Sequence, residues 1–116
     1  MNIYDTANKL AKEIRESDEY VTFKKLKEEI AADLEKKNKL DEFEKARYEA
    51  QILSIQGVEG NTEKLIKLQE QYTELLKDES IQAYFEAEIR FSTILQDVNR
   101  IIAEAVKDII GIGIEE

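Results

Sequence analysis

Residues 81–110 read IQAYFEAEIRFSTILQDVNRIIAEAVKDII and contain neither Gly nor Pro. The apolar positions of this stretch recur in steps of mostly three and four; they are Ile81, Tyr84, Phe85, Phe91, Leu95, Val98, Ile102, Ala105 and Ile109. This spacing predicts one long amphipathic helix. A helix of about 30 residues spans about 45 Å, whereas a compact globule of this chain length is about 35 Å across. We therefore expect an elongated molecule, or a second chain that covers the excess.

The composition indicates one small helical domain without a thiol or imidazole site. A chain of 116 residues is typical of a single domain, here residues 1–116. It can bury roughly two-thirds of its unfolded surface without a disulfide. The chain contains no Cys and no His. The lack of Cys excludes thiolate metal ligands and thiol nucleophiles, and the lack of His removes the commonest general base.

The charge argues against anionic partners. The chain has 26 Asp and Glu residues against 17 Lys and Arg residues, a net charge of −9. A negative field repels nucleic-acid phosphates and anionic lipid surfaces, so we expect neither nucleic acid nor membrane as a partner. The first residues lack the features of a signal peptide, and no run approaches the ~20 apolar residues of a membrane span. We expect a cytoplasmic protein.

Four shorter helices are predicted before the long one. The first runs from about Ile3 to Glu16. Ser17 or Asp18 can cap the second, whose apolar stripe continues to Leu34. Lys36, Lys37 and Lys39 then cluster where a helix C-terminus favours cations, and Asn38 can end that helix or cap the next.

The third helix is expected from Leu40 to a left-handed C′ residue at Gly57, and the fourth from a cap at Asn61 or Thr62. Asp78 or Ser80 can cap the long fifth helix. The apolar Gly/Ile tail at 111–116 is expected to be disordered. The predicted fold class is therefore all-α: an antiparallel bundle of about five helices with a long C-terminal helix.

Glu88 is the unusual residue of the long helix because it lies on the apolar stripe, next to Phe85 and Phe91. A buried carboxylate needs a partner. The structural interpretation is a contact with Arg47 or with a helix N-terminus. The functional interpretation is a metal ligand in a carboxylate-based metal-binding bundle or a metal-assisted enzyme. The structural interpretation is favoured, because no second ligand set is visible and a di-iron bundle uses Glu-x-x-His motifs.

The long helix is predicted to supply much of a homodimer interface. The residues expected there are Tyr84, Phe85, Glu88, Phe91, Leu95, Val98, Asn99 and Ile102. A buried Asn99 can fix the register of paired helices, although a surface position suits its spacing equally. No catalytic residue, cofactor site or resident metal site is predicted.

The chain resembles the YlbF/YmcA family of small bacterial helical proteins, nearest its YheA-like branch. The segments that carry the resemblance are Ile3-Tyr4-Asp5 with Ala7, Leu10, Ile14 and Ser17; Glu19-Tyr20; Asp33; Phe43; Tyr84 with Ala87-Glu88; and Val98-Asn99 with Ile101-Ile102. The similarity covers nearly the whole chain, and the long final helix after a loop adds to it.

The resemblance implies an all-helical fold that dimerises through its helices and has no known enzymatic activity. Some relatives are accessory factors in competence, sporulation, biofilm formation and RNA processing, in a complex that carries iron–sulfur clusters. Without Cys this chain cannot supply thiolate ligands to such a cluster. We expect a non-catalytic adaptor or regulator that binds itself and another cytoplasmic protein, and the metal-binding bundle around Glu88 is the alternative.

Overall fold

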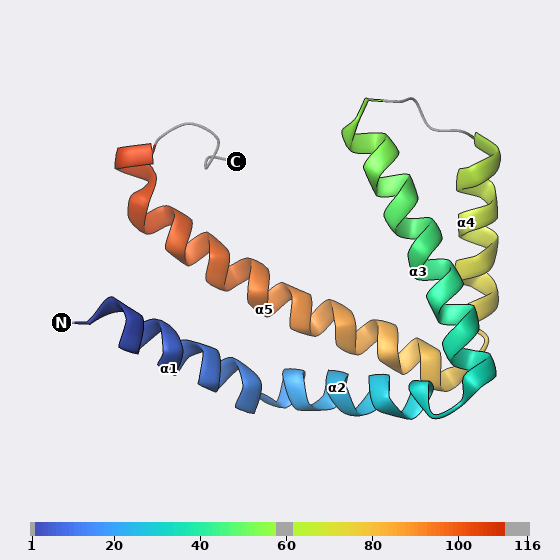
Figure 1. The fold of residues 1–116 in the computed structure, drawn as a ribbon, viewed down its shortest axis with the longest axis horizontal. Coiled ribbons are helices and arrows are strands. Elements are labelled where there is room, and N and C mark those ends of the chain that lie inside the picture. Colours follow the sequence, from blue (N-terminus) through green and yellow to red (C-terminus); the bar gives the residue numbers. More distant parts are fainter. Residues whose placement is uncertain (1, 58–61, 111–116) are drawn as a thin grey trace. The chain divides into compact units, whose positions relative to one another are not determined.

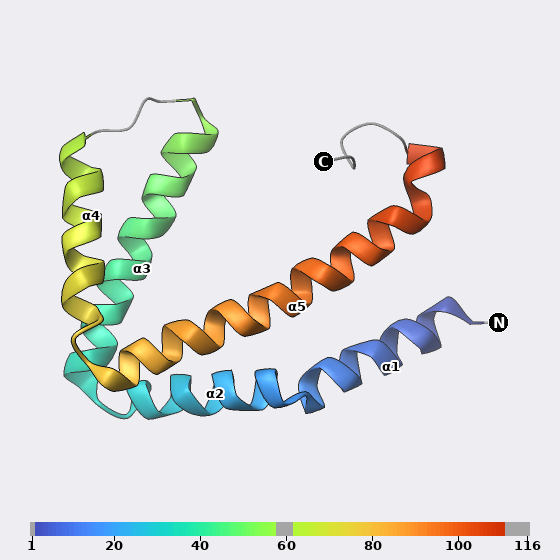
Figure 2. The ribbon, with the colours of Figure 1, turned by 180° about the vertical axis from the view of Figure 1, so that it is seen from behind.

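A computed structural model describes residues 2–57 and 62–110 of the chain. These residues form five α-helices: α1 (Ile3–Glu16), α2 (Asp18–Ala31), α3 (Leu34–Ile55), α4 (Thr62–Leu75) and α5 (Glu79–Ile110). Figures 1 and 2 show them from opposite sides. The predicted all-α fold with a long C-terminal helix is confirmed. The predicted cap at Asn61 and the tail at 111–116 lie outside the described residues.

One serine separates the first two helices. Ser17 Oγ donates to the carbonyl of Ile14, 2.7 Å away, at the end of α1. The same oxygen accepts from the backbone N–H of Tyr20 at 3.1 Å. Ser17 therefore satisfies backbone groups of both helices, which explains a break without Gly or Pro. The predicted first helix and its Ser17 boundary are confirmed.

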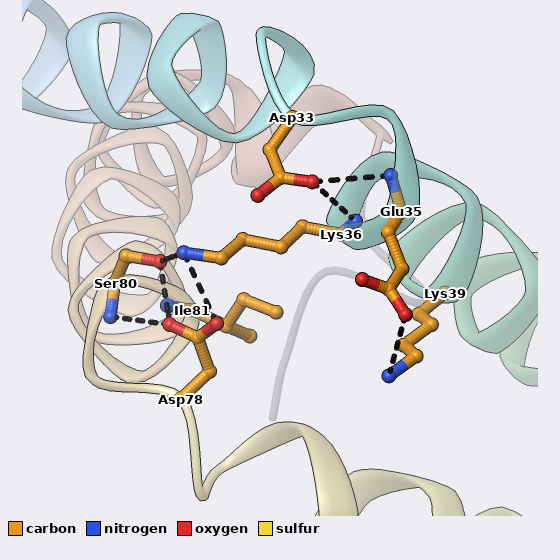
Figure 3. Close-up of polar contacts among 7 residues, drawn as sticks. All are labelled: Asp33, Glu35, Lys36, Lys39, Asp78, Ser80 and Ile81. Carbon is orange, nitrogen blue, oxygen red and sulfur yellow. Dashed lines mark hydrogen bonds and ion pairs between the residues drawn. The ribbon is translucent and has the colours of Figure 1, made fainter.

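The boundary between the second and third helices was placed wrongly. α2 ends at Ala31 and α3 begins at Leu34, so Leu34 does not lie on the second helix and is 70% exposed. Asp33 is the N-cap of α3, and its Oδ1 accepts from the backbone N–H groups of Glu35 and Lys36 (Figure 3). This carboxylate satisfies two donors of the first turn and suits the positive end of the helix.

As a result, the basic cluster has a different role from the one expected. Lys36, Lys37 and Lys39 lie in the first turns of α3 rather than at the end of α2, and Asn38 is inside α3. Two of the lysines are held by acidic neighbours on the same helix. Lys37 Nζ lies 2.9 Å from Asp41 and Lys39 Nζ lies 3.9 Å from Glu35. The end of α3 was predicted correctly, because Gly57 adopts a left-handed φ of 78°.

The chain divides into two compact units, residues 24–85 and residues 1–23 with 86–116. The prediction of one domain stays a prediction. In the first unit, α3 and α4 pack against each other as an antiparallel hairpin joined through the segment after Gly57 (Figure 1). The buried core of this unit consists of Ile30, Leu40, Phe43, Leu75, Ile81, Tyr84 and Phe85.

Aromatic rings dominate that core. The rings of Phe43, Tyr72 and Phe85 meet pairwise, with centroids 5.3–5.8 Å apart. The Tyr84 ring lies 5.6 Å from that of Phe85. Such pairs stabilise by about 0.5–1.5 kcal/mol each beyond the burial of their area. The cluster joins α3, α4 and the first turns of α5.

The described residues of the second unit, 2–23 and 86–110, have much less core. It contains α1, the first residues of α2 and most of α5. Phe91 of α5 contacts the rings of Tyr20 and Phe23, both with centroids 5.7 Å away. Ala87 is the one residue of these ranges that is buried. Most of the apolar surface of α5 in this unit is therefore not covered by the described residues of the chain.

Candidate interaction surface

The start of α5 is fixed by a polar cluster of three side chains. Asp78 Oδ1 accepts from the backbone N–H of Ser80 at 2.9 Å and of Ile81 at 3.4 Å, which makes Asp78 the cap of α5, as predicted. Its other oxygen lies 3.1 Å from Lys36 Nζ. Lys36 also donates to Ser80 Oγ at 3.0 Å, so the cluster ties the first turn of α3 to that of α5 (Figure 3).

The same cluster perturbs one titration. A hydrogen bond of 2.6 Å from Ser80 Oγ is the main reason that the pKa of Asp78 is lowered from 3.8 to about 2. Lys36 and the backbone N–H groups of Ser80 and Ile81 also lower this pKa, whereas burial acts in the opposite direction. The Asp78 side chain is 31% exposed, so screening by water reduces the stabilisation to about 1 kcal/mol.

Two of the residues expected at an interface lie in the core of their own chain. Tyr84 and Phe85 are 2% and 4% exposed. The Tyr84 hydroxyl donates to Glu44 Oε2 of α3 at 3.2 Å, which satisfies its polar end. Their burial stabilises the chain that carries them, and their place at a dimer interface stays a prediction.

The other expected residues lie further along α5, where exposure increases. Glu88, Phe91 and Val98 are half-buried, whereas Asn99 is exposed. Leu95 is 38% exposed and Ile102 is 55% exposed.

The exposed residues continue one row that reaches the end of the helix. Val106 is 38% and Ile109 is 84% exposed. We call Leu95, Asn99, Ile102, Val106 and Ile109 the α5 stripe. Its steps of four, three, four and three are the spacing of a seam between packed helices.

A second surface, which the sequence analysis missed, lies between α3 and α4. It is an open groove of about 720 Å³, which we call the hairpin groove. Its apolar lining residues are Ala46, Ala50, Leu53, Leu65 and Leu68. Its charged lining residues are Glu42, Lys45 and Glu49 from α3 and Lys64 and Lys67 from α4. Since each helix was read only for its core stripe, the surface that two packed helices form together could not be seen.

The sequence matches the family model described as control of competence regulator ComK, YlbF/YmcA, over residues 3–107. This range begins at the first residue of α1 and ends three residues before the end of α5. The chain belongs to this family. The resemblance stated on the sequence is confirmed at that level.

Two relatives of this YlbF/YmcA protein are similar to it along most of their length. A UPF0342 protein of Alkalihalophilus pseudofirmus is 38% identical over 110 residues, which cover 95% of this chain and 93% of the relative. A UPF0342 protein of Staphylococcus aureus strain JH9 is also 38% identical, over 94% of this chain and 96% of the relative. No solved structure matches the chain.

In this YlbF/YmcA protein the residues 2–57 and 62–110 contain no group of three side chains that could hold a metal ion. The predicted contact of Glu88 with Arg47 stays a prediction. Arg47 itself lies 5.3 Å above the Phe43 ring, and its Nη2 is 3.8 Å from Glu44 Oε2. None of the helices in these ranges is long and apolar enough to cross a membrane.

Proposed function

We propose that this YlbF/YmcA protein is a non-catalytic helical adaptor of the YheA-like branch, which acts in the cytoplasm as a homodimer and binds another protein. The observation that carries the proposal is the α5 stripe. It is a regular row, apolar except for Asn99, on a helix whose first turns are buried in a core, and Ile109 at its end is 84% exposed. Exposed apolar rows of this kind mark protein–protein contacts.

The chemistry of the described residues supports an adaptor more than a catalyst. The lowered pKa of Asp78 has a structural cause, because its hydrogen bonds belong to a helix cap. Catalytic groups usually show shifts in a cleft with a second reactive partner. The family description refers to control of a competence regulator, and we propose a regulatory role of the same general kind for this chain.

Light scattering at micromolar concentration tests the homodimer. The expected mass is 27 kDa, twice the 13.5 kDa of one chain. Leu95→Asp introduces a charge into the α5 stripe and should shift the protein toward the monomer, because an unpaired buried charge costs several kcal/mol. Glu104→Ala is the control, since Glu104 forms an exposed pair with Lys107 at 2.9 Å. A mass of one chain for the unmodified protein refutes the homodimer.

A further inference from the structure

The proposed homodimer leaves open how much of the second unit takes part in the contact. We propose that α1 and the last turns of α5 pack face to face against the same two segments of a second copy and form an antiparallel four-helix bundle. The proposal rests on the proposed function, because it names the surface through which the homodimer forms. It is carried by the distribution of charged and apolar residues around α5 and α1.

The charged side chains in the last turns of α5 lie on one narrow side of the helix. Since successive residues turn by about 100°, all of them fall within an arc of about 100°. They are Arg90, Asp97, Arg100, Glu104, Lys107 and Asp108. A helix on the surface of a globular protein usually shows an apolar stripe of about that width and a broad charged side. The last turns of α5 have the reverse proportion, which is the pattern of a helix with neighbours on several sides.

The described residues of the chain cover only one part of this uncharged surface. Phe91 contacts the rings of Tyr20 and Phe23. Ile94 and Val98 follow Phe91 on the same side of the helix and are half-buried. The centre of the α5 stripe lies about 70° further around the helix, and all residues of the stripe are exposed. A second neighbour is therefore needed beside the one that the chain supplies.

α1 also has an apolar side that the chain leaves uncovered. Its charged residues lie on one side of the helix, and its apolar residues share the other, with Ile3, Tyr4, Ala7, Leu10, Ala11 and Ile14. None of the residues of α1 is buried, and Ile3 and Tyr4 are 75% and 79% exposed. α1 runs antiparallel to the last turns of α5 (Figures 1 and 2). Two helices bury only the sides that face each other, so apolar surface of both stays open.

The lack of charge on this surface fits a second copy of the chain. Two chains of net charge −9 repel each other unless their charges lie away from the contact. The charged residues between Arg90 and Asp108 lie at least about 120° from the centre of the α5 stripe. A partner of complementary charge would find no charged group to recognise there, whereas an identical uncharged surface matches it.

The size of the surface also fits a dimer. The segments from Ile3 to Phe23 and from Glu88 to Ile110 are each about 30 Å long. Two such helices side by side, with axes about 10 Å apart, measure about 20 Å across. The resulting face of about 600 Å² per copy is close to the roughly 800 Å² that each partner buries in a stable interface.

Glu88 favours the antiparallel direction for the two α5 helices. Glu88 lies on the same side of α5 as the stripe, so a parallel pair would bring two like charges to the same level of the contact. In an antiparallel pair with Ile102 on the two-fold axis, Leu95 faces Ile109 of the second copy, because each lies seven residues from Ile102. Every neighbouring pair of the bundle is then antiparallel, which brings helix ends of opposite partial charge together.

Disulfide trapping tests this contact, because the native chain has no Cys. Ile102→Cys should give a disulfide dimer of 27 kDa, twice the 13.5 kDa of one chain, under mild oxidation. Leu95→Cys mixed with Ile109→Cys should give a mixed dimer of the same mass. Glu104→Cys is the control, since Glu104 lies opposite the stripe and forms an exposed pair with Lys107. Its disulfide should form about tenfold more slowly.

Each other result overturns a defined part of the inference. Equally fast trapping of Glu104→Cys and Ile102→Cys overturns the orientation of α5. A disulfide between two Leu95→Cys chains that forms faster than the mixed 95–109 product reverses the direction. A dimer mass in light scattering without an Ile102→Cys disulfide means that the homodimer stands and the bundle fails. A single-chain mass refutes the proposed function as well.

Ile3→Asp separates a four-helix bundle from a contact of α5 alone. Ile3 is 75% exposed, and an acidic residue suits the first turn of a helix, so the variant should fold. The charge lies on the apolar side of α1, and dimerisation should weaken by about tenfold or more. Asn8→Asp adds the same charge on the charged side of α1 and is the control. An Ile3→Asp variant that dimerises as tightly as the unmodified protein removes α1 from the contact and overturns the bundle.

Discussion

The first turns of α5 and its last turns belong to one uninterrupted helix but have opposite environments. Ile81, Tyr84, Phe85 and Ala87 are 2–4% exposed, whereas Ile102 and Ile109 are 55% and 84% exposed. Both segments show the same spacing of apolar residues. The difference teaches that a helical stripe predicts a surface to be buried, but not whether the chain's own helices or another chain will bury it.

The two segments also differ in their polar contacts. The first turns are held by Asp78, Lys36 and Ser80 and by the hydrogen bond from Tyr84 to Glu44. On the last turns, exposed neighbours on the same helix form ion pairs, such as Asp97 with Arg100 at 2.9 Å. Such exposed pairs contribute about 0.3–0.5 kcal/mol. We therefore expect substitutions in the two segments to have very different effects on stability.

The largest effect is expected for Phe85→Ala. Phe85 touches three aromatic rings and is 4% exposed, so its removal leaves a cavity among α3, α4 and α5. The free energy of unfolding should fall by about 3–5 kcal/mol, measured by urea denaturation. Ile109→Ala in the exposed segment is the matched control. A loss below 1 kcal/mol for Phe85→Ala would mean that the aromatic cluster is not the core.

Asp78→Ala should destabilise the protein by about 1–2 kcal/mol at pH 7, because α5 loses its cap and Lys36 its partner. The folded pKa of about 2 lies below the ordinary 3.8, so the carboxylate stabilises the fold above pH 4. This contribution is lost as the pH falls through 2.

Urea titrations at several pH values check this. The difference between the unmodified protein and Asp78→Ala should narrow between pH 4 and pH 2. Asp41→Ala, which removes an exposed partner of Lys37, is the control and should cost about 0.5 kcal/mol or less. A difference that stays constant down to pH 2 contradicts the lowered pKa of Asp78.

Tyr84→Phe should cost about 1 kcal/mol. The substitution keeps the ring in the core but removes the hydroxyl that donates to Glu44. Thermal unfolding of the two single variants, Tyr84→Phe and Glu44→Gln, and of the double variant separates this hydrogen bond from other effects. If the two substitutions are additive, the hydrogen bond makes no measurable contribution.

The smallest effect on chain stability is expected for Ile109→Ser. At concentrations where the chain is monomeric, the change should stay within about 0.5 kcal/mol, since the side chain is 84% exposed. At concentrations where the chain dimerises, the same variant should dimerise more weakly. Light scattering should then show a higher protein concentration at which half of the dimer is dissociated. A variant that dimerises as tightly as the unmodified protein would remove Ile109 from the interface.

Helix ends that depend on a few neighbouring residues could be predicted from the sequence, whereas one helix break could not. Asp78 was one of the two predicted caps of α5, with Ser80, and Gly57 was predicted as a left-handed helix end, because both features depend on residues within one turn. The Asp33 cap was missed, since the apolar spacing runs on through Leu34 and suggested a continuing helix. The spacing of apolar residues alone does not reveal where a helix ends if the next helix continues the same spacing.

The sequence by itself determined the all-α class, the long final helix and the absence of thiol and imidazole chemistry. These follow from local spacing, from the lack of Gly and Pro between residues 81 and 110, and from composition. Only the tertiary structure decided that Tyr84 and Phe85 are internal, that the α5 stripe is exposed and that α3 and α4 enclose a groove. The physical reason is that burial depends on residues distant in sequence, which no spacing within one helix can specify.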